Sequence, residues 1–223
     1  MEINSEILIK EPSFREKHSA ALRIWHWSSL LVILGSLVTV FFAKVIFNTK
    51  DATKVVQDNL QKSNVTATAD QAKSVAHEFN DIIWHWHTCI GYVLAALFGF
   101  RILLEFFQPG DQKVKRVIKN ALKYLRQPAI DKANTTHYVI VKAGYLLFYF
   151  ALLVQVCTGL FMAYSDGMAN LKDLRHTMKN IHSVFMWVIV VYIVLHITGT
   201  IIAEQTKKQK GLVSDMINGG ERE

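Results

Sequence analysis

Long apolar stretches separated by polar segments form the main pattern of this sequence. Each of four such stretches exceeds the roughly 20 residues that a helix needs to cross the hydrocarbon of a bilayer, and few charges interrupt them. All three prolines lie outside these stretches, so we expect unbroken helices. The pattern predicts four membrane-spanning helices, at about 24–47, 82–107, 138–164 and 181–203.

Consecutive spans run in opposite directions. The predicted fold is therefore an all-α integral membrane four-helix bundle with up-down-up-down topology, built as a single domain over residues 1–223. The polar connection at 48–81 would suit a helical hairpin or a helix with turns. In the connection at 108–137, apolar residues recur every three or four positions over 114–125, with Lys and Arg between them. This spacing predicts a basic amphipathic helix lying on an anionic membrane surface, the alternative being a soluble helix docked to a partner.

Basic residues are concentrated on one side of the predicted bundle. Four precede the first span, seven lie in 108–137 and four lie in the C-terminal tail. Because Lys and Arg mark the cytoplasmic side, we place both termini and 108–137 in the cytoplasm, and 48–81 and 165–180 outside. The net charge of +7 then describes a surface that faces membrane lipid. We expect no nucleic-acid partner, since the basic residues flank spans instead of forming a folded patch.

Histidines inside the spans are the strongest chemical signal, because an ionisable residue in a membrane segment is costly and is a functional-site hypothesis by default. There are five: His26, His85, His87, His182 and His196. Imidazoles that face one another across a helix bundle are suited to holding haem iron.

Helix geometry sorts these histidines into two depths. Positions 182 and 196 are separated by about 21 Å along a helix and offset by only about 40°, so both can face one core. His182 would lie at an outer level, facing His85 or His87, and His196 at an inner level, facing His26. Two positions rotate a helix by about 200°, so at most one of His85 and His87 faces the core. Gly91, one turn further on, favours His87 and leaves His85 as an interfacial or supporting residue.

The spans also carry short motifs. They are Arg23-Ile24-Trp25-His26-Trp27; His87-Thr88-Cys89-Ile90-Gly91-Tyr92 followed by Arg101; Thr136-His137-Tyr138 through Lys142-Ala143-Gly144-Tyr145, with Gln155 and Thr158-Gly159-Leu160; and Ile181-His182 with Leu195-His196 and Glu204. Together they resemble the bacterial four-helix di-haem b-type cytochromes, which include bacterial cytochrome b561 and the cytochrome b subunit of membrane-bound nickel–iron hydrogenases. The resemblance covers roughly residues 14–206.

The resemblance implies two haem b groups, each held by two histidines, and electron exchange with a quinone. Mapped residue by residue, the ligands are His26 with His196 at the inner level and His87 with His182 at the outer level. Candidates for a quinone pocket or a supporting role are His85, Trp25, His137, Tyr138, Lys142, Arg23 and Arg101. Interfacial anchoring and snorkelling are the alternative reading of these aromatic and basic residues.

We therefore expect a multi-pass protein of the bacterial inner (cytoplasmic) membrane that relays electrons between an extracytoplasmic redox protein, such as an iron–sulfur subunit or a c-type cytochrome, and the quinone pool. The connection at 48–81 is longer than the resemblance implies for the minimal stand-alone members, which favours a subunit of a hydrogenase or dehydrogenase. A self-contained cytochrome b561-type quinone oxidoreductase is the alternative, and a non-haem metal-binding membrane protein or a structural anchor are more distant ones.

Overall fold

The computed structural model describes residues 18–107, 113, 119, 122, 132–206 and 211–219. Helices dominate these residues, which contain no β-strand. In chain order the elements are α1 (Ala20–Phe41), the π-helical η2 (Phe42–Ile46), α2 (Thr49–Lys62), α3 (Ala69–Phe107), α5 (Lys132–Tyr164), the 3-10 helix η3 (Ala169–Leu171), α6 (Lys172–Gln205) and α7 (Leu212–Asn218). The predicted all-α membrane bundle is confirmed, because four of these helices are long and apolar enough to cross a membrane: α1 with η2, α3, α5, and α6 with η3.

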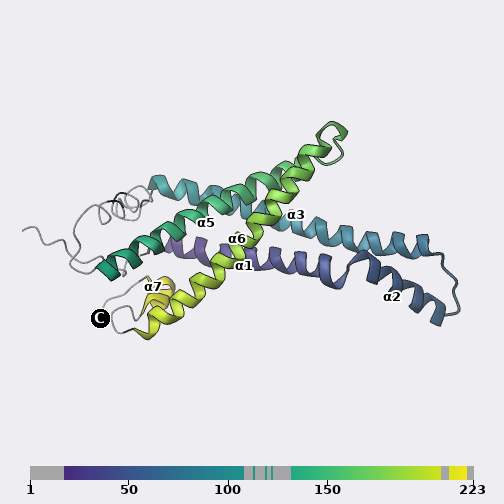
Figure 1. Cartoon of the computed structure of the whole chain (residues 1–223), viewed down its shortest axis with the longest axis horizontal. Coiled ribbons are helices and arrows are strands. Elements are labelled where there is room, and N and C mark those ends of the chain that lie inside the picture. The colour runs from purple at the N-terminus through teal and green to yellow at the C-terminus, as the bar shows by residue number, and fades with distance from the viewer. Residues whose placement is uncertain are drawn as a thin grey trace, which may run out of the picture.

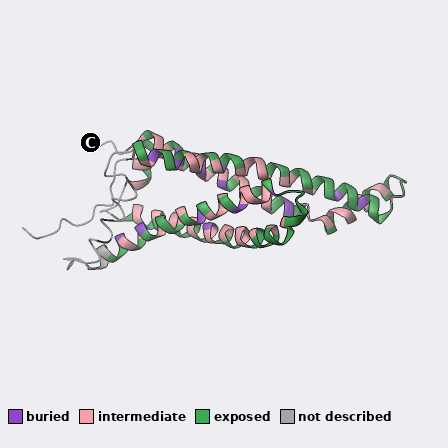
Figure 2. Ribbon diagram, turned by 90° about the horizontal axis from the view of Figure 1, so that it is seen from above, coloured by how far each residue is buried: buried purple, intermediate pink, exposed green. Residues whose placement is uncertain are grey.

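The spans form two antiparallel pairs. α1 packs closely along α3, and α5 packs closely along α6, while α3 and α5 join the two pairs (Figure 1, Figure 2). Among the described residues, α6 has no comparably close backbone packing with α1 or α3. The side chains that bridge α6 to those two helices include the histidines described below.

Apolar side chains cover the outside of the bundle as well as its core. Ile24, Leu31 and Val38 recur every seven residues on α1, and all three are exposed. On α6 the same is true of Val184 and Val191. Such a surface is unfavourable in water and is expected for helices whose outer faces contact lipid.

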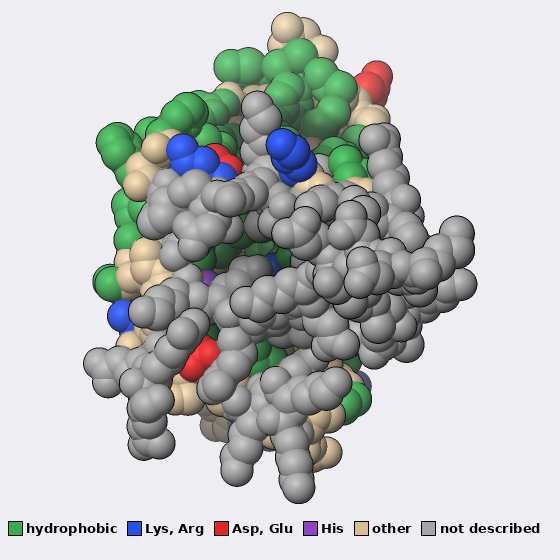
Figure 3. All heavy atoms as spheres, turned by 90° about the vertical axis from the view of Figure 1, so that its left-hand side faces the viewer, with side chains coloured by type: hydrophobic (Ala, Val, Ile, Leu, Met, Phe, Trp, Pro, Cys, Tyr) green, Lys and Arg blue, Asp and Glu red, His purple; other side chains and the backbone are tan. Residues whose placement is uncertain are grey.

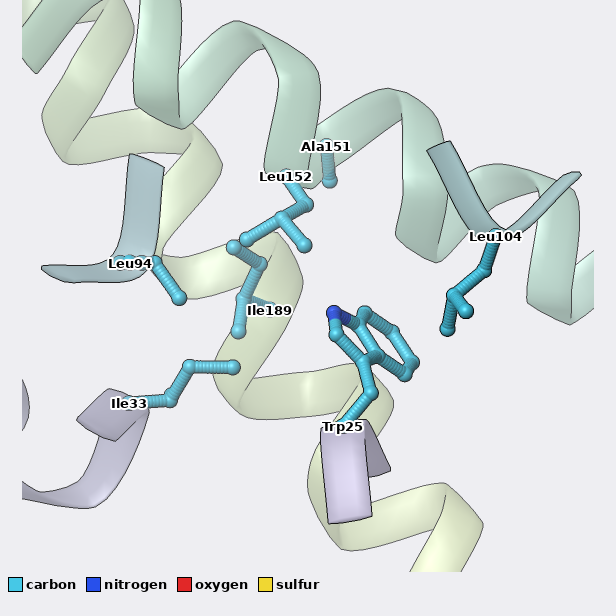
Figure 4. Close-up of a cluster of buried hydrophobic side chains, with 7 residues drawn as sticks. All are labelled: Trp25, Ile33, Leu94, Leu104, Ala151, Leu152 and Ile189. Carbon is cyan, nitrogen blue, oxygen red and sulfur yellow. The ribbon is translucent and has the colours of Figure 1, made fainter. Parts of the chain in front are cut away.

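A belt of buried side chains lies halfway along the four spans. Ile33, Leu94, Leu152 and Ile189 each come from a different helix and belong to one cluster, which Trp25, Leu104 and Ala151 extend (Figure 4). Ile189 lies seven residues from both His182 and His196, so the belt separates the two histidine depths.

One helical arm extends beyond the bundle. α2 packs on the first part of α3, and both reach well past the turn between α5 and α6 (Figure 1). Ala72 and Ala76 are fully buried in this arm, which allows close helix approach. The side-chain amide of Asn80 donates to the carbonyls of Ala43 and Phe47 at 2.9 and 3.0 Å, so it satisfies acceptors at the end of the first span. Much of segment 48–81 is thus helical.

The opposite end of the bundle carries the short helix α7. Both Glu204 carboxylate oxygens accept backbone N–H bonds, from Gly211 at 2.9 Å and from Val213 at 2.8 Å, and Arg23 donates to the carbonyl of Ile217. Figure 3 views this end and shows Lys, Arg and acidic side chains near the end face, with apolar side chains around the sides. The amphipathic helix expected at 114–125 lies outside the described residues apart from isolated positions.

Candidate functional site

Four histidines meet as two pairs inside the bundle. The ring centroids of His87 on α3 and His182 on α6 are 6.4 Å apart, with an interplanar angle of 80°. Those of His26 on α1 and His196 on α6 are 6.3 Å apart, with an interplanar angle of 62°. We call the first the outer pair and the second the inner pair. α6 contributes one ring to each pair, and each partner ring comes from a helix whose backbone α6 does not closely approach.

Threonine hydroxyls hold both rings of the outer pair. Thr39 Oγ1 lies 2.9 Å from His87 Nδ1, and Thr158 Oγ1 lies 2.9 Å from His182 Nδ1. Ser36 Oγ is a longer contact, at 3.4 Å from His87 Nδ1. These bonds occupy Nδ1 of each ring and make no use of Nε2. A ring fixed in this way is the usual arrangement of a metal-ligating histidine.

Glycines give the outer pair room. A Cβ added at Gly159 would lie 3.3 Å from His182 Cε1, which is tighter than an ordinary contact. Glycine at 159 therefore lets the ring lie against the α5 backbone. A Cβ added at Gly91, one turn after His87, would meet no atom within 4 Å, so a flat group can come close to α3 there.

Aromatic rings surround the inner pair. Tyr192 stacks on His196, with centroids 5.8 Å apart and planes within 10°, and the Tyr145 ring lies 6.5 Å away. Trp27 lies edge-on to His26 at 5.1 Å. Within the described part of the chain, His26 Nδ1 is buried and has no hydrogen-bond partner. The inner pair therefore differs from the outer pair in how its rings are held.

The spacing of both pairs fits one iron between two imidazoles. Two metal–imidazole bonds of about 2.0–2.1 Å, one on each side of a metal, place the ring centroids about 6 Å apart, and the observed separations are 6.3 and 6.4 Å. No group of three or more His, Cys, Asp or Glu side chains among the described residues is placed to hold a metal ion. A zinc or copper site would need such convergence, whereas haem supplies the remaining ligands to its own iron. The residues present thus fit haem.

Two buried cations lie at the level of the inner pair. Arg101 is 6% exposed, contacts Glu105 at 3.4 Å and the Tyr149 hydroxyl at 3.1 Å, and lies over the Trp25 and Tyr149 rings. Lys142 is 8% exposed, and its Nζ lies between the Tyr138 and Tyr145 rings at 5.2 and 5.4 Å. Cations buried in a membrane bundle need anionic or polar partners, and Arg101 has them in Glu105 and the Tyr149 hydroxyl.

The other predicted residues lie in varied surroundings. His85 is exposed, with Nε2 3.7 Å from Cys89 Sγ, and takes part in neither pair. His137 is also exposed, whereas Tyr138 is buried. Trp25 is buried and donates from Nε1 to the carbonyl of Leu97 at 2.8 Å, which ties α1 to α3.

Arg23 borders an open pocket of about 420 Å³ on the lipid-facing side of α1. The lining is mostly apolar: Ala20, Arg23, Ile24, Trp27, Ser28, Leu31 and Ile217. Trp27, which contacts His26, forms part of the wall, so the pocket lies next to the inner pair.

Sequence reasoning assigned no role to Thr39 or Ser36, and it used Thr158 and Gly159 only as parts of a motif. A signal for these residues was present, because isolated hydroxyl residues inside apolar spans often bond across helices. The signal does not say which partner each hydroxyl takes. Tyr192 gave no signal, since a tyrosine in an apolar span is usually a packing residue or an anchor.

The family model described as prokaryotic cytochrome b561 matches residues 17–219. No curated protein and no solved structure matches the chain. The matched range contains all four spans, both histidine pairs and α7.

Proposed function

The chain belongs to the prokaryotic cytochrome b561 family, so it is a bacterial multi-pass membrane cytochrome of the b type that acts in electron transfer, and we propose that it relays single electrons across the inner membrane between an extracytoplasmic redox protein and quinone. The observation that carries this proposal is the pair of matched imidazole spacings, 6.4 and 6.3 Å, at two depths of one bundle.

We assign two haem b groups to these sites, one between His87 and His182 and one between His26 and His196. When bound, haem iron supplies reversible one-electron chemistry at a potential that the protein sets. Two histidines would hold each iron, which favours electron relay over substrate chemistry at the metal. The protein's own part is to hold the rings, to exclude water with the apolar belt and to compensate buried charge.

Quinone is proposed to bind at the inner level. The pocket beside Arg23 is open to the lipid phase, from which a quinone would enter, and its wall includes Trp27, which contacts the His26 ring. The Arg23 guanidinium can donate to a quinone carbonyl. Arg101 and Lys142 are assigned to the acidic groups at the edge of the inner haem, because both are buried beside the tyrosines that surround His196.

The redox partner is proposed to dock at the arm formed by α2 and the start of α3. α3 has 39 residues and is therefore about 58 Å long, whereas the hydrocarbon core is only about 30 Å thick. The arm belongs to the end of the bundle nearer the outer pair, because α3 runs from the arm to His87 before it reaches the belt residue Leu94. Lys and Arg distribution assigns that end to the outside of the cell.

Haem counting on purified variants tests the ligand assignment. Wild-type protein from haem-replete cells should bind two haem b per chain by the pyridine haemochrome assay. His182→Ala and His196→Ala should each bind one, because each removes a ligand from a single site, and His85→Ala should still bind two. Full haem content in either ligand variant, or a colourless wild type, would contradict the proposal. Co-purification from native membranes then separates a partnered subunit from a self-contained quinone oxidoreductase.

A further inference from the structure

We propose that Thr39 and Thr158 are positioning residues of the outer pair: their hydroxyls fix the tautomer of His87 and His182 so that both present Nε2 to the iron, and they hold the reduction potential of that site low. This inference rests on the proposed function, since it takes the two histidines as haem ligands. It adds residues to which neither the family match nor the motifs assign a role.

The direction of the first bond follows from where the Thr39 proton goes. Thr39 Oγ1 donates to the backbone carbonyl of Ser36 at 2.6 Å, a common back-bond of threonine inside a helix. A hydroxyl has one proton, so the same oxygen can only accept from His87 Nδ1 at 2.9 Å. His87 must then carry its proton on Nδ1. Its Nε2 keeps the lone pair, which is what a metal ligand needs.

Thr158 on α5 faces His182 in the same way. Thr158 Oγ1 donates to the carbonyl of Val154 at 2.7 Å, and it lies 2.9 Å from His182 Nδ1. Thr158 is 5% exposed, so water does not compete for this bond. Gly159 next to it leaves the space that the His182 ring occupies. Two helices thus supply the same device to the two rings of one pair.

The inner pair lacks this device on at least one ring, since His26 Nδ1 is buried without a partner among the described residues. The difference has an electronic consequence. An Nδ1–H that donates a hydrogen bond makes the imidazole a stronger electron donor to its metal, which stabilises the ferric state and lowers the potential. The outer site is therefore expected to have the lower potential of the two because of Thr39 and Thr158.

Redox titration of single-site protein tests this inference. In a His196→Ala background only the outer haem should remain, so its midpoint potential can be read without overlap. Thr39→Val and Thr158→Val keep the side-chain shape and remove the acceptor, and each should shift the midpoint potential to more positive values. Thr39→Ser and Thr158→Ser keep the hydroxyl and should restore the original potential.

Thr88→Val is the matched control. Thr88 follows His87 directly and makes the same kind of back-bond, to the carbonyl of Trp84 at 3.0 Å. Within the described part of the chain it makes no hydrogen bond to either ring of the pair. The midpoint potential of the outer haem in Thr88→Val should match that of the parent protein. Loss of haem from a Val variant that the Ser variant restores would also support the role of the hydroxyl.

Two results would overturn the inference: unchanged potentials in both Val variants that retain haem, or equal shifts in Thr88→Val. These results are distinguishable from failure of the proposed function. If the ligands themselves are wrong, His87→Ala and His182→Ala retain two haems. If only the threonine role is wrong, those two variants lose one haem while the Val variants titrate like the parent.

Discussion

Leu152 offers a direct measure of how strongly the two helix pairs hold together. It is fully buried in the apolar belt, whereas the adjacent Leu153 is 42% exposed on the outer face of the same helix. In water-soluble proteins Leu→Ala costs about 2.7–5.0 kcal/mol, the sum of a transfer term and a cavity term. In a membrane the transfer term largely cancels, because the unfolded helices also leave their leucines among lipid tails. Only the lost packing remains, so we expect Leu152→Ala to lower the unfolding free energy by about 1–3 kcal/mol.

The assay is reversible unfolding of the purified protein in mixed detergent micelles, with SDS as the denaturant and the haem absorption band as the signal. Leu153→Ala is the control and should change stability by less than about 0.5 kcal/mol. The folded Leu152→Ala protein should still bind two haems, because no ligand has moved. Equal losses in the two variants would refute the argument, since they would mean that position 152 is no better packed than a lipid-facing site.

Two further substitutions test local features. Gly159→Ala should reduce haem retention at the outer level, because the new Cβ would lie 3.3 Å from the His182 ring. Gly144→Ala should be tolerated, since its Cβ would lie at an ordinary 3.6 Å from Tyr192. The haem content of the two purified variants tests this difference. Glu204→Ala should release α7 at a cost of about 1–2 kcal/mol, because the carboxylate accepts the N–H groups of Gly211, just before that helix, and of Val213 in its first turn. Hydrogen exchange over residues 212–218 measures the release of α7, and unchanged protection of these residues would contradict the capping role of Glu204.

The bundle was predictable because the signals that specify it are local. An apolar run of sufficient length can only be a helix in a bilayer, and the fourteen-residue spacing of His182 and His196 gives their relative depth and face from helix geometry alone. The choice of His87 over His85 rested on Gly91. The structure pairs His87 with His182 and leaves His85 exposed, while the ligand role itself stays a prediction until haem is counted.

What sequence reasoning missed depends on contacts between distant segments. Thr39 is 48 residues from His87 in the chain, and its role depends on how α1 is rotated against α3, which no periodicity in either helix specifies. α7 is only seven residues long and would be marginal as an isolated helix. It is placed by Glu204 and Arg23, one of which lies almost two hundred residues away.

The distance between the two histidine depths also sets how far charge moves through the electric field of the membrane. A separation of about 21 Å within hydrocarbon about 30 Å thick spans about two thirds of the voltage drop. At about 2.3 kcal/mol per charge per 100 mV, one electron crossing between the levels would involve about 1.5 kcal/mol of electrical work for every 100 mV of membrane potential. With iron held at His182 and at His196 as proposed, the protein would be sensitive to membrane voltage, and the polarity of the energised membrane would bias which of the two sites is reduced.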